Sequence, residues 1–289
     1  PLSLVPLRDG RWSGTWQARN TGTIQVSITV TAAIPDMNIQ GTAQILGRLQ
    51  ANPNIPQVGE GAVVSAASFA QQVPVSPGSL VSIFGIELAE GTGSAESLPL
   101  GTQLAGTSVV LGGQALPLLF ASEGQLNAMI PYNLAVNTQH QLVVQRGTSY
   151  TVPEPVTIAA AQPAVFTINQ QGTGQGAVLN QDFSLNSEEN PAVIGEVVQV
   201  FCSGLGAVDP PVMAGEAAPS EPLSQTVNPV FLTIGGIEAP VLFSGLAPGF
   251  SGLYQVNAMV PDGVETSSEV LVILTVAGQS SPPVNIAVQ

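Results

Sequence analysis

The chain has 289 residues, of which 44% are hydrophobic and only 8% charged, so it can bury a substantial core and is not expected to be disordered. It contains no lysine, and 19 acidic residues give it a net charge of −14. A body this acidic repels nucleic acids and anionic membranes, and no apolar run approaches the roughly 20 residues that span a bilayer. We therefore expect no nucleic-acid partner and no membrane insertion.

The first 50 residues differ from the rest in charge and in strand content. They hold four of the five arginines and only two acidic residues, Asp9 and Asp36. The pattern predicts strands at 2–7, 11–17, 23–31 and 41–49, with a turn at Asp9–Gly10, whereas an immunoglobulin-like sandwich needs about seven strands. Residues 1–50 are therefore predicted to be a partial or small β domain, and 51–61 a linker.

The remainder of the chain contains an internal repeat. QLNAMIP at Gln125–Pro131 recurs as QVNAMVP at Gln255–Pro261, and each copy alternates apolar and polar residues before a proline, as a half-buried strand does. Upstream, LGGQALPLLF at Leu111–Phe120 recurs as IGGIEAPVLF at Ile234–Phe243. The repeat marks domain architecture, and its QxNAMxP strands are predicted to be core strands.

Short runs of Val, Ile, Leu and Thr between Gly and Pro residues predict an all-β chain. We find no convincing segment with helical periodicity, and regular short strands with turn signals are typical of sandwiches. GSLVSIFGIELA at 78–89 also matches GEVVQVFCSGLG at 195–206. We predict tandem immunoglobulin-like β-sandwich domains, repeat 1 at 62–162 and repeat 2 at 163–289.

The second copy carries two insertions between matched strands. One of them is the loop GLAPGFSG at Gly245–Gly252. Because loops carry function more often than the elements they connect, we expect function where the copies differ. This makes Pro248 and Phe250 candidate ligand or interface residues, together with the acidic hairpin near Asp182 and the segment 1–50.

The order of the sequence blocks resembles a known family over residues 60–289. The blocks are PGSLVSIFGIELA, GGQALPLLFASEGQLNAMIPYNL, GAVLNQDFSLNSEENPA, VFCSGLG and LFSGLAPGFSGLYQVNAMVP. They are similar to the uncharacterised Solibacter-type C-terminal domain of large exported acidobacterial proteins, and PGSLVSIFG is also similar to the first strands of IPT/TIG immunoglobulin-like domains. The resemblance implies a secreted or surface-exposed β-sandwich module, extracellular or at the cell surface, and it transfers no catalytic residues.

Residue types needed for catalysis are scarce. The only histidine, His140, lies in a polar stretch and is expected in a solvated turn; the only cysteine, Cys202, lies in an apolar strand and is expected to be a structural thiol. No GxSxG elbow is present, and no nucleophile has a base beside it. We predict no catalytic residue, no cofactor and no enzymatic activity; a hydrolase would require a pair of carboxylates in a cleft.

Two groups of residues are candidates for ligand binding. NQDFSLNSEEN supplies Asp182, Glu188 and Glu189 as calcium candidates, although the spacing differs from an EF-hand loop and also fits a solvated hairpin. Trp12 and Trp16 fall on one face of a predicted strand. We favour a buried pair; an exposed pair would form a platform for sugar rings.

The leading functional hypothesis is a non-enzymatic extracellular structural or adhesive protein. PLSLVPL at Pro1–Leu7 alternates like a strand that could add to an open sheet edge, and a head-to-tail contact that does not close gives a filament. The alternative is a carbohydrate-binding or cell-adhesion module of a larger secreted protein. The expected partner is accordingly a second copy of the chain, extracellular matrix or a glycan.

Overall fold

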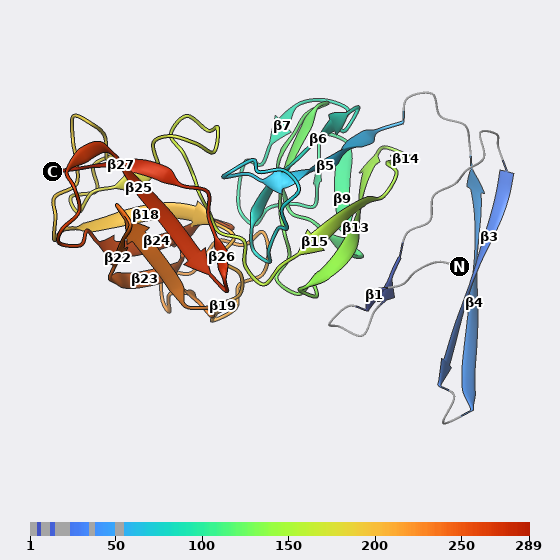
Figure 1. The fold of residues 1–289 in the computed structure, drawn as a ribbon. Coiled ribbons are helices and arrows are strands. Elements are labelled where there is room, and N and C mark those ends of the chain that lie inside the picture. The colour runs from blue at the N-terminus through green and yellow to red at the C-terminus, as the bar shows by residue number, and fades with distance from the viewer. Residues whose placement is uncertain (1–4, 7–11, 15–23, 35–37, 50–54) are drawn as a thin grey trace. The chain divides into compact units, whose positions relative to one another are not determined.

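The computed structural model describes residues 5–6, 12–14, 24–34, 38–49 and 55–289. Throughout these ranges the regular elements are β-strands (Figure 1), and none of the described segments is a helix long and apolar enough to cross a membrane. The chain divides into two compact units, residues 16–55 and residues 1–15 with 56–289. The second of these contains two β-sandwiches, which confirms the predicted tandem immunoglobulin-like fold.

The first sandwich packs two antiparallel sheets. One has the order β5 (Gln57–Ser65), β6 (Leu80–Ile86), β12 (Gln125–Met129), β11 (Leu118–Ala121) and β7 (Gly93–Ser94). The other has the order β10 (Gln114–Ala115), β9 (Thr107–Leu111), β13 (Thr138–Arg146) and β14 (Ser149–Tyr150), with β15 (Glu154–Ile158) on β13 and β8 (Gln103–Leu104) on β9. Strand β5 begins inside the stretch 51–61 that was predicted to be a linker.

The second sandwich repeats this plan. One sheet has the order β16 (Ala164–Val165), β18 (Val197–Ser203), β24 (Tyr254–Met259), β23 (Val241–Leu246), β20 (Gln225–Thr226) and β19 (Val208–Asp209), with β17 (Val178–Leu179) on β18. The other has the order β22 (Ile237–Ala239), β21 (Val230–Ile234), β25 (Ser267–Val276) and β26 (Gln279–Ser280), with β27 (Val284–Val288) on β25. The repeated strands β12 and β24 thus occupy equivalent central places.

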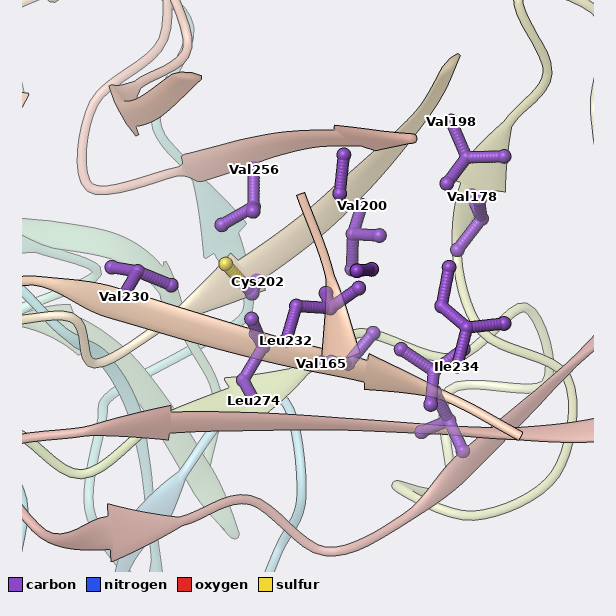
Figure 2. Packing of buried hydrophobic residues seen from close by; sticks show 14 of the residues in the cluster. Val165, Val178, Val198, Val200, Cys202, Val230, Leu232, Ile234, Val256 and Leu274 are labelled. Carbon is purple, nitrogen blue, oxygen red and sulfur yellow. The ribbon is translucent and has the colours of Figure 1, made fainter. Parts of the chain in front are cut away.

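Each sandwich has its own apolar core, filled by alternate residues of its strands. In the second sandwich, β18 and β24 contribute Val200, Cys202 and Val256, while the facing sheet contributes Leu232 and Leu274 (Figure 2). The first core is built the same way from both of its sheets. Full burial of one such side chain stabilises the fold by about 1.5–3 kcal/mol.

The described part of the other unit is a long hairpin. Strands β3 (Ile24–Ile34) and β4 (Ile39–Leu49) form 11 antiparallel residue pairs, from Ile24 opposite Leu49 to Ile34 opposite Ile39. They include the strand predicted at 41–49 and residues 24–31 of the one predicted at 23–31, whose first residue lies outside the described residues.

The hairpin is amphipathic. Its more polar face carries Ser27, Thr29 and Gln44 together with the exposed Leu46, and Gln44 Nε2 donates to Ser27 Oγ over 2.7 Å. The opposite face is apolar and solvent-exposed: Ile45 is 62% exposed. A two-stranded hairpin is marginally stable alone, so this face would gain stability from being covered.

A two-residue ladder lies at the start of the chain. Strand β1 (Val5–Pro6) pairs with β2 (Trp12–Ser13), Val5 being opposite Ser13. The turn predicted at Asp9–Gly10 lies outside the described residues. The predicted first strand therefore pairs within its own chain over this short length.

Substitution of Leu126 tests the prediction that the repeated strand is a core strand. Its side chain is fully buried, so Leu126→Ala is expected to lower the free energy of unfolding by about 2–5 kcal/mol. Leu185, whose side chain is exposed on the hairpin at residues 180–190, is the control, and Leu185→Ala should change stability by no more than about 0.5 kcal/mol. Urea denaturation measures both, and equal effects would contradict the assignment of Leu126 to the core.

Candidate functional site

The two insertions of the second copy lie where the sandwiches meet. The backbone N–H of Gly215, in the first insertion-bearing segment (207–233), approaches Sδ of Met129 at 3.3 Å, and Ser251 Oγ in the second insertion approaches the same sulfur at 3.3 Å. The insertions also contact each other, because Ala218 N donates to Phe250 O over 2.8 Å. Met129, the last residue of β12, is therefore enclosed by both insertions.

Tyr132 follows the same strand and packs against the core of the second sandwich. Its burial raises the pKa of the phenol to about 12, so the side chain is neutral at physiological pH. The equivalent residue after β24 is Asp262, which is exposed. The two copies thus differ at the position where the first copy inserts a side chain into its neighbour.

Close backbone approach completes this contact. Gly252 has φ +70°, and a Cβ there would lie 2.8 Å from Leu80 Cδ2. Gly78, with φ +77°, leaves no room for a Cβ beside the rings of Tyr132 and Tyr254. Both positions therefore require glycine. We call the contact made by Leu80, Met129, Tyr132, Ser203, Gly215, Ser251 and Gly252 the inter-sandwich interface; it also includes a 3.0 Å hydrogen bond from Leu80 N to Ser203 Oγ.

The loop GLAPGFSG at Gly245–Gly252, which was predicted to bind a ligand or form an interface, is partly exposed and partly buried. Pro248 and Phe250 are exposed, with Phe250 at 57%, whereas Ser251 and Gly252 are buried in the inter-sandwich interface. Half of the GLAPGFSG insertion therefore has a structural role that its turn-like composition did not reveal.

The two tryptophans are only partly described. Trp12 lies on β2 and is 64% exposed, so the expectation that it is buried is wrong. Trp16 lies outside the described residues. The structure therefore does not test whether the two rings form a common platform.

The prediction of a solvated turn at His140 is wrong. His140 lies on β13, is fully buried, and its Nε2 is 2.9 Å from the carbonyl oxygen of Ala135. Alternation along TQHQLVVQR places it in phase with Leu142 and Val144, both of which face the core. That phase was visible in the sequence, but the polar neighbours obscured it.

The acidic hairpin near Asp182 is held in place by hydrogen bonds of asparagine side chains. Buried Asn186 donates from Nδ2 to Asn180 Oδ1 and to the Ala287 carbonyl, each over 2.9 Å, while its Oδ1 accepts from Ala287 N over 2.8 Å. Asn186 therefore ties the hairpin to strand β27.

The three calcium candidates do not converge. The Ser184 hydroxyl and backbone N–H donate to Asp182 Oδ1 and lower the pKa of that carboxyl. Glu188 and Glu189 are exposed, and in the described part of the chain no three His, Cys, Asp or Glu side chains gather as a metal site would require.

A further set of residues, present in both copies, was not predicted. In the first sandwich, Gln125 and Asn127 of β12 lie on the face opposite the core, and Gln125 Nε2 donates to Asn127 Oδ1 over 2.8 Å. Phe84 is the cross-strand neighbour of Gln125, and Phe120 that of Asn127. All four side chains are half-buried.

The second sandwich reproduces the arrangement. Gln255 Nε2 donates to Asn257 Oδ1, again over 2.8 Å, with Phe201 opposite Gln255 and Phe243 opposite Asn257. We call Phe84, Phe120, Gln125 and Asn127 the first amide face, and Phe201, Phe243, Gln255 and Asn257 the second. The sequence did contain a signal for these residues: the glutamine and the asparagine of QxNAMxP recur in both copies, although a core strand requires only its inward apolar residues.

A β-bulge lies beside each amide face. The register shifts between Leu118 and Phe120 in the first sandwich and between Val241 and Phe243 in the second. Bulges redirect side chains and are frequent next to functional sites. The ring of Phe243 also lies over Gly245, where a Cβ would be 2.8 Å from Phe243 Cζ. The absence of a side chain at Gly245 therefore leaves room for the ring of Phe243.

The comparisons with known proteins concern the fold alone. No family model matches the chain, and no curated protein matches it. SGBP-B of the mixed-linkage glucan utilization locus of Bacteroides ovatus, solved in complex with a mixed-linkage heptasaccharide, is 14% identical, with 97% of this chain and 55% of that chain covered at a TM-score of 0.35. Domains 5–6 of the S-layer protein SbsC are 12% identical, covering 81% and 98%, with a TM-score of 0.26.

A tandem of domains from titin is 6% identical, and the match covers 100% of this chain and 88% of that chain at a TM-score of 0.21. The chain spans about half the length of SGBP-B from Bacteroides ovatus and of a second SGBP-B, from Bacteroides uniformis. Similarity at this level carries no argument about ligand or partner.

Cys202 provides a test of the core beside the second amide face. The thiol is fully buried, and burial raises its pKa above the ordinary value, so the reactive thiolate is suppressed at neutral and mildly alkaline pH. We expect no reaction with a thiol reagent such as Ellman's in the native protein at pH 8, and one equivalent in denaturant. Rapid native labelling would contradict this packing.

Proposed function

We propose that the chain is a non-enzymatic extracellular structural or adhesive module, in which two β-sandwiches are held at a fixed spacing. The observation that carries the proposal is the inter-sandwich interface. Domains joined by small polar contacts move relative to each other by default. Here an aromatic side chain, a buried methionine and glycine-dependent backbone contacts favour a single arrangement instead.

The sequence differences between the copies support this role. Both insertions contribute to the inter-sandwich interface, and Tyr132 replaces what is an exposed aspartate in the second copy. A module that works by shape gains from consecutive domains that lock to each other, and the residues that make this contact are the ones that differ between the copies. The extracellular location and the lack of enzymatic activity are parts of the same proposal, supported by the Solibacter-type resemblance and by the scarcity of nucleophile–base pairs in the sequence.

A second candidate function is self-association, favoured by the apolar face of the hairpin. On β3 this face carries Val26, Ile28 and Val30, which lie opposite Gly47, Ile45 and Ala43 of β4. Bulky residues thus form a ridge along one strand, and small residues flank Ile45 along the other.

A second copy fits this ridge and groove. Rotating a copy by half a turn about an axis parallel to the strands places Val26 and Val30 of each copy over Gly47 and Ala43 of the other. Such a contact is isologous and closed, unlike a filament. A head-to-tail filament through the strand at Pro1–Leu7 stays a prediction; the pairing of Val5–Pro6 with β2 uses one edge of that strand.

Exchanging the residues that follow the repeated strands tests the fixed spacing. Tyr132→Asp would bury a charge and remove the aromatic contact, so we expect the inter-sandwich interface to open and stability to fall by about 3 kcal/mol. Asp262→Tyr, at the exposed equivalent position, should change stability by no more than about 0.5 kcal/mol.

Distances between spin labels on the two sandwiches provide the readout. Labels at Gln139→Cys and Glu265→Cys, both exposed positions, should give one narrow distance distribution in the otherwise unchanged chain and a broad one with Tyr132→Asp. A broad distribution without Tyr132→Asp would refute the proposal of fixed spacing.

Sedimentation velocity tests the self-association candidate. Ile45→Thr places a hydroxyl in the centre of the apolar face and is expected to shift a concentration-dependent dimer to monomer. Thr42→Ser, on the polar face of the same strand, is the control and should leave the dimer intact. An unaltered chain that sediments only as a monomer, or a dimer that persists with Ile45→Thr, would eliminate this contact.

A further inference from the structure

The amide faces combine three features. They lie on the sides of the sheets opposite the cores and are half-buried; in the first, the ring of Phe69 lies against Phe84 with centroids 6.4 Å apart. A Gln-to-Asn bond of 2.8 Å is common to both copies, while Ser82 Oγ also donates to Asn127 Oδ1 in the first and Gln255 Nε2 also donates to Gln199 Oε1 in the second, each over 3.2 Å. Each has a β-bulge beside a phenylalanine. A packing role accounts for the inward-facing Leu126 and Val256, but it does not require two amides at the outward positions.

The hydrogen-bonding groups of each face are complementary to hydroxyls. The Gln-to-Asn bond fixes the orientation of both amides, together with a second bond in each copy, from Ser82 Oγ to Asn127 Oδ1 in the first and from Gln255 Nε2 to Gln199 Oε1 in the second. It leaves the asparagine Nδ2 as a donor and the glutamine Oε1 as an acceptor on neighbouring outward positions of one strand. Adjacent hydroxyls on a sugar ring each donate and accept, so a pre-oriented donor and acceptor side by side match them.

The phenylalanines supply the other half of such a site. Phe120 and Phe243 lie directly across the ladder from Asn127 and Asn257. An aromatic ring beside polar groups covers the apolar C–H face of a sugar while the amides bind its edge, and aromatic side chains dominate the energetics of contacts of this size. The equivalent pair occurs once in each sandwich.

The absence of charged residues on the amide faces favours a neutral carbohydrate over an anionic one. The strands that build them, β6, β11, β12, β18, β23 and β24, contain no charged residue. The net charge of −14 repels anionic polymers. A neutral ligand avoids that repulsion and leaves no charge unpaired on contact.

We propose that each amide face binds a neutral carbohydrate chain, so that one protein carries two equivalent sites. Asn127 and Asn257 donate to a sugar hydroxyl, Gln125 and Gln255 accept from a neighbouring one, and Phe120 and Phe243 contact the ring. These residues differ from the tryptophans and from the GLAPGFSG loop that the sequence suggested. The inference rests on the proposed extracellular binding role, but it does not depend on fixed spacing, because each site lies within one sandwich.

Isothermal titration of the whole chain with neutral hexasaccharides from β-glucan, mannan and xylan tests the proposal, with an alginate hexasaccharide as the anionic control. At least one neutral ligand should bind with a stoichiometry of two, and alginate should not bind. Absence of binding by all three neutral ligands would overturn the proposal. Binding by alginate alone would do the same.

Isosteric variants assign the sites. Asn127→Asp keeps the oxygen that accepts from Gln125 but removes the outward Nδ2 donor, so the first site should weaken by about tenfold or more, and Asn257→Asp should do the same to the second. The combined variant should abolish binding. Phe120→Leu, which keeps a comparable volume without the ring, should weaken the first site independently if an aspartate variant fails to fold.

Three controls make the outcome specific. Gln139→Ala removes an exposed amide outside both faces and should leave both sites intact, as should Trp12→Ala. Tyr132→Asp should also leave hexasaccharide binding at a stoichiometry of two. The failure of the fixed-spacing proposal can therefore be told apart from the failure of the carbohydrate proposal. If binding survives the combined aspartate variant, or is lost with Trp12→Ala, the amide faces are not the sites. If no ligand binds and the combined variant dissociates a dimer, the faces are contacts between copies.

Discussion

The described sandwiches depend on one contact, in which the end of the first repeated strand is enclosed by the second sandwich. Met129 is contacted by segments that only the second copy possesses, and Tyr132 packs against the core of the second sandwich. Desolvation of the tyrosine and the absence of a side chain at Gly78 and Gly252 make the contact specific, since a Cβ at these glycines would collide with the side chains of Tyr132 and Leu80. Prolines in the connecting segment alone would make the connection between the sandwiches stiff. The packing at the inter-sandwich interface also favours one orientation of the second sandwich relative to the first.

This contact explains why the two copies diverged where they did. An interface between consecutive repeats cannot be symmetric, because one copy contributes its C-terminal corner and the other contributes the surface that receives it. Tyr132 and Asp262 are the two outcomes of that asymmetry: the side chain that enters a neighbour is aromatic and buried, and its equivalent is charged and exposed. The inserted segments fill the space around Met129, so their length reflects packing.

The sequence predicted the fold well because strand alternation and Gly/Pro punctuation are local signals. It predicted sites poorly, because exposure depends on which face of a strand meets another sheet. His140 was assigned from its polar neighbours, although its phase with Leu142 and Val144 places it in the core. Asp182, Glu188 and Glu189 are close in sequence, yet the hairpin that carries them is shaped by Asn186, and its hydrogen bonds to β27 could not be inferred without the tertiary structure.

Alternate residues of the repeated strand face opposite sides of the sheet, so one short sequence pattern specifies two different surfaces. Its inward positions hold the core, and its outward positions place a glutamine and an asparagine in the same bonded geometry in both sandwiches. The outward set also contributes to the sheet, because Ser82 Oγ donates to Asn127 in the first sandwich and Gln255 donates to Gln199 in the second. These additional bonds differ between the copies, whereas the Gln-to-Asn bond, the phenylalanine and the bulge recur in both. The recurring part is the part on which the proposed carbohydrate contact rests, since it leaves an asparagine donor beside an aromatic ring on the same face of each sheet.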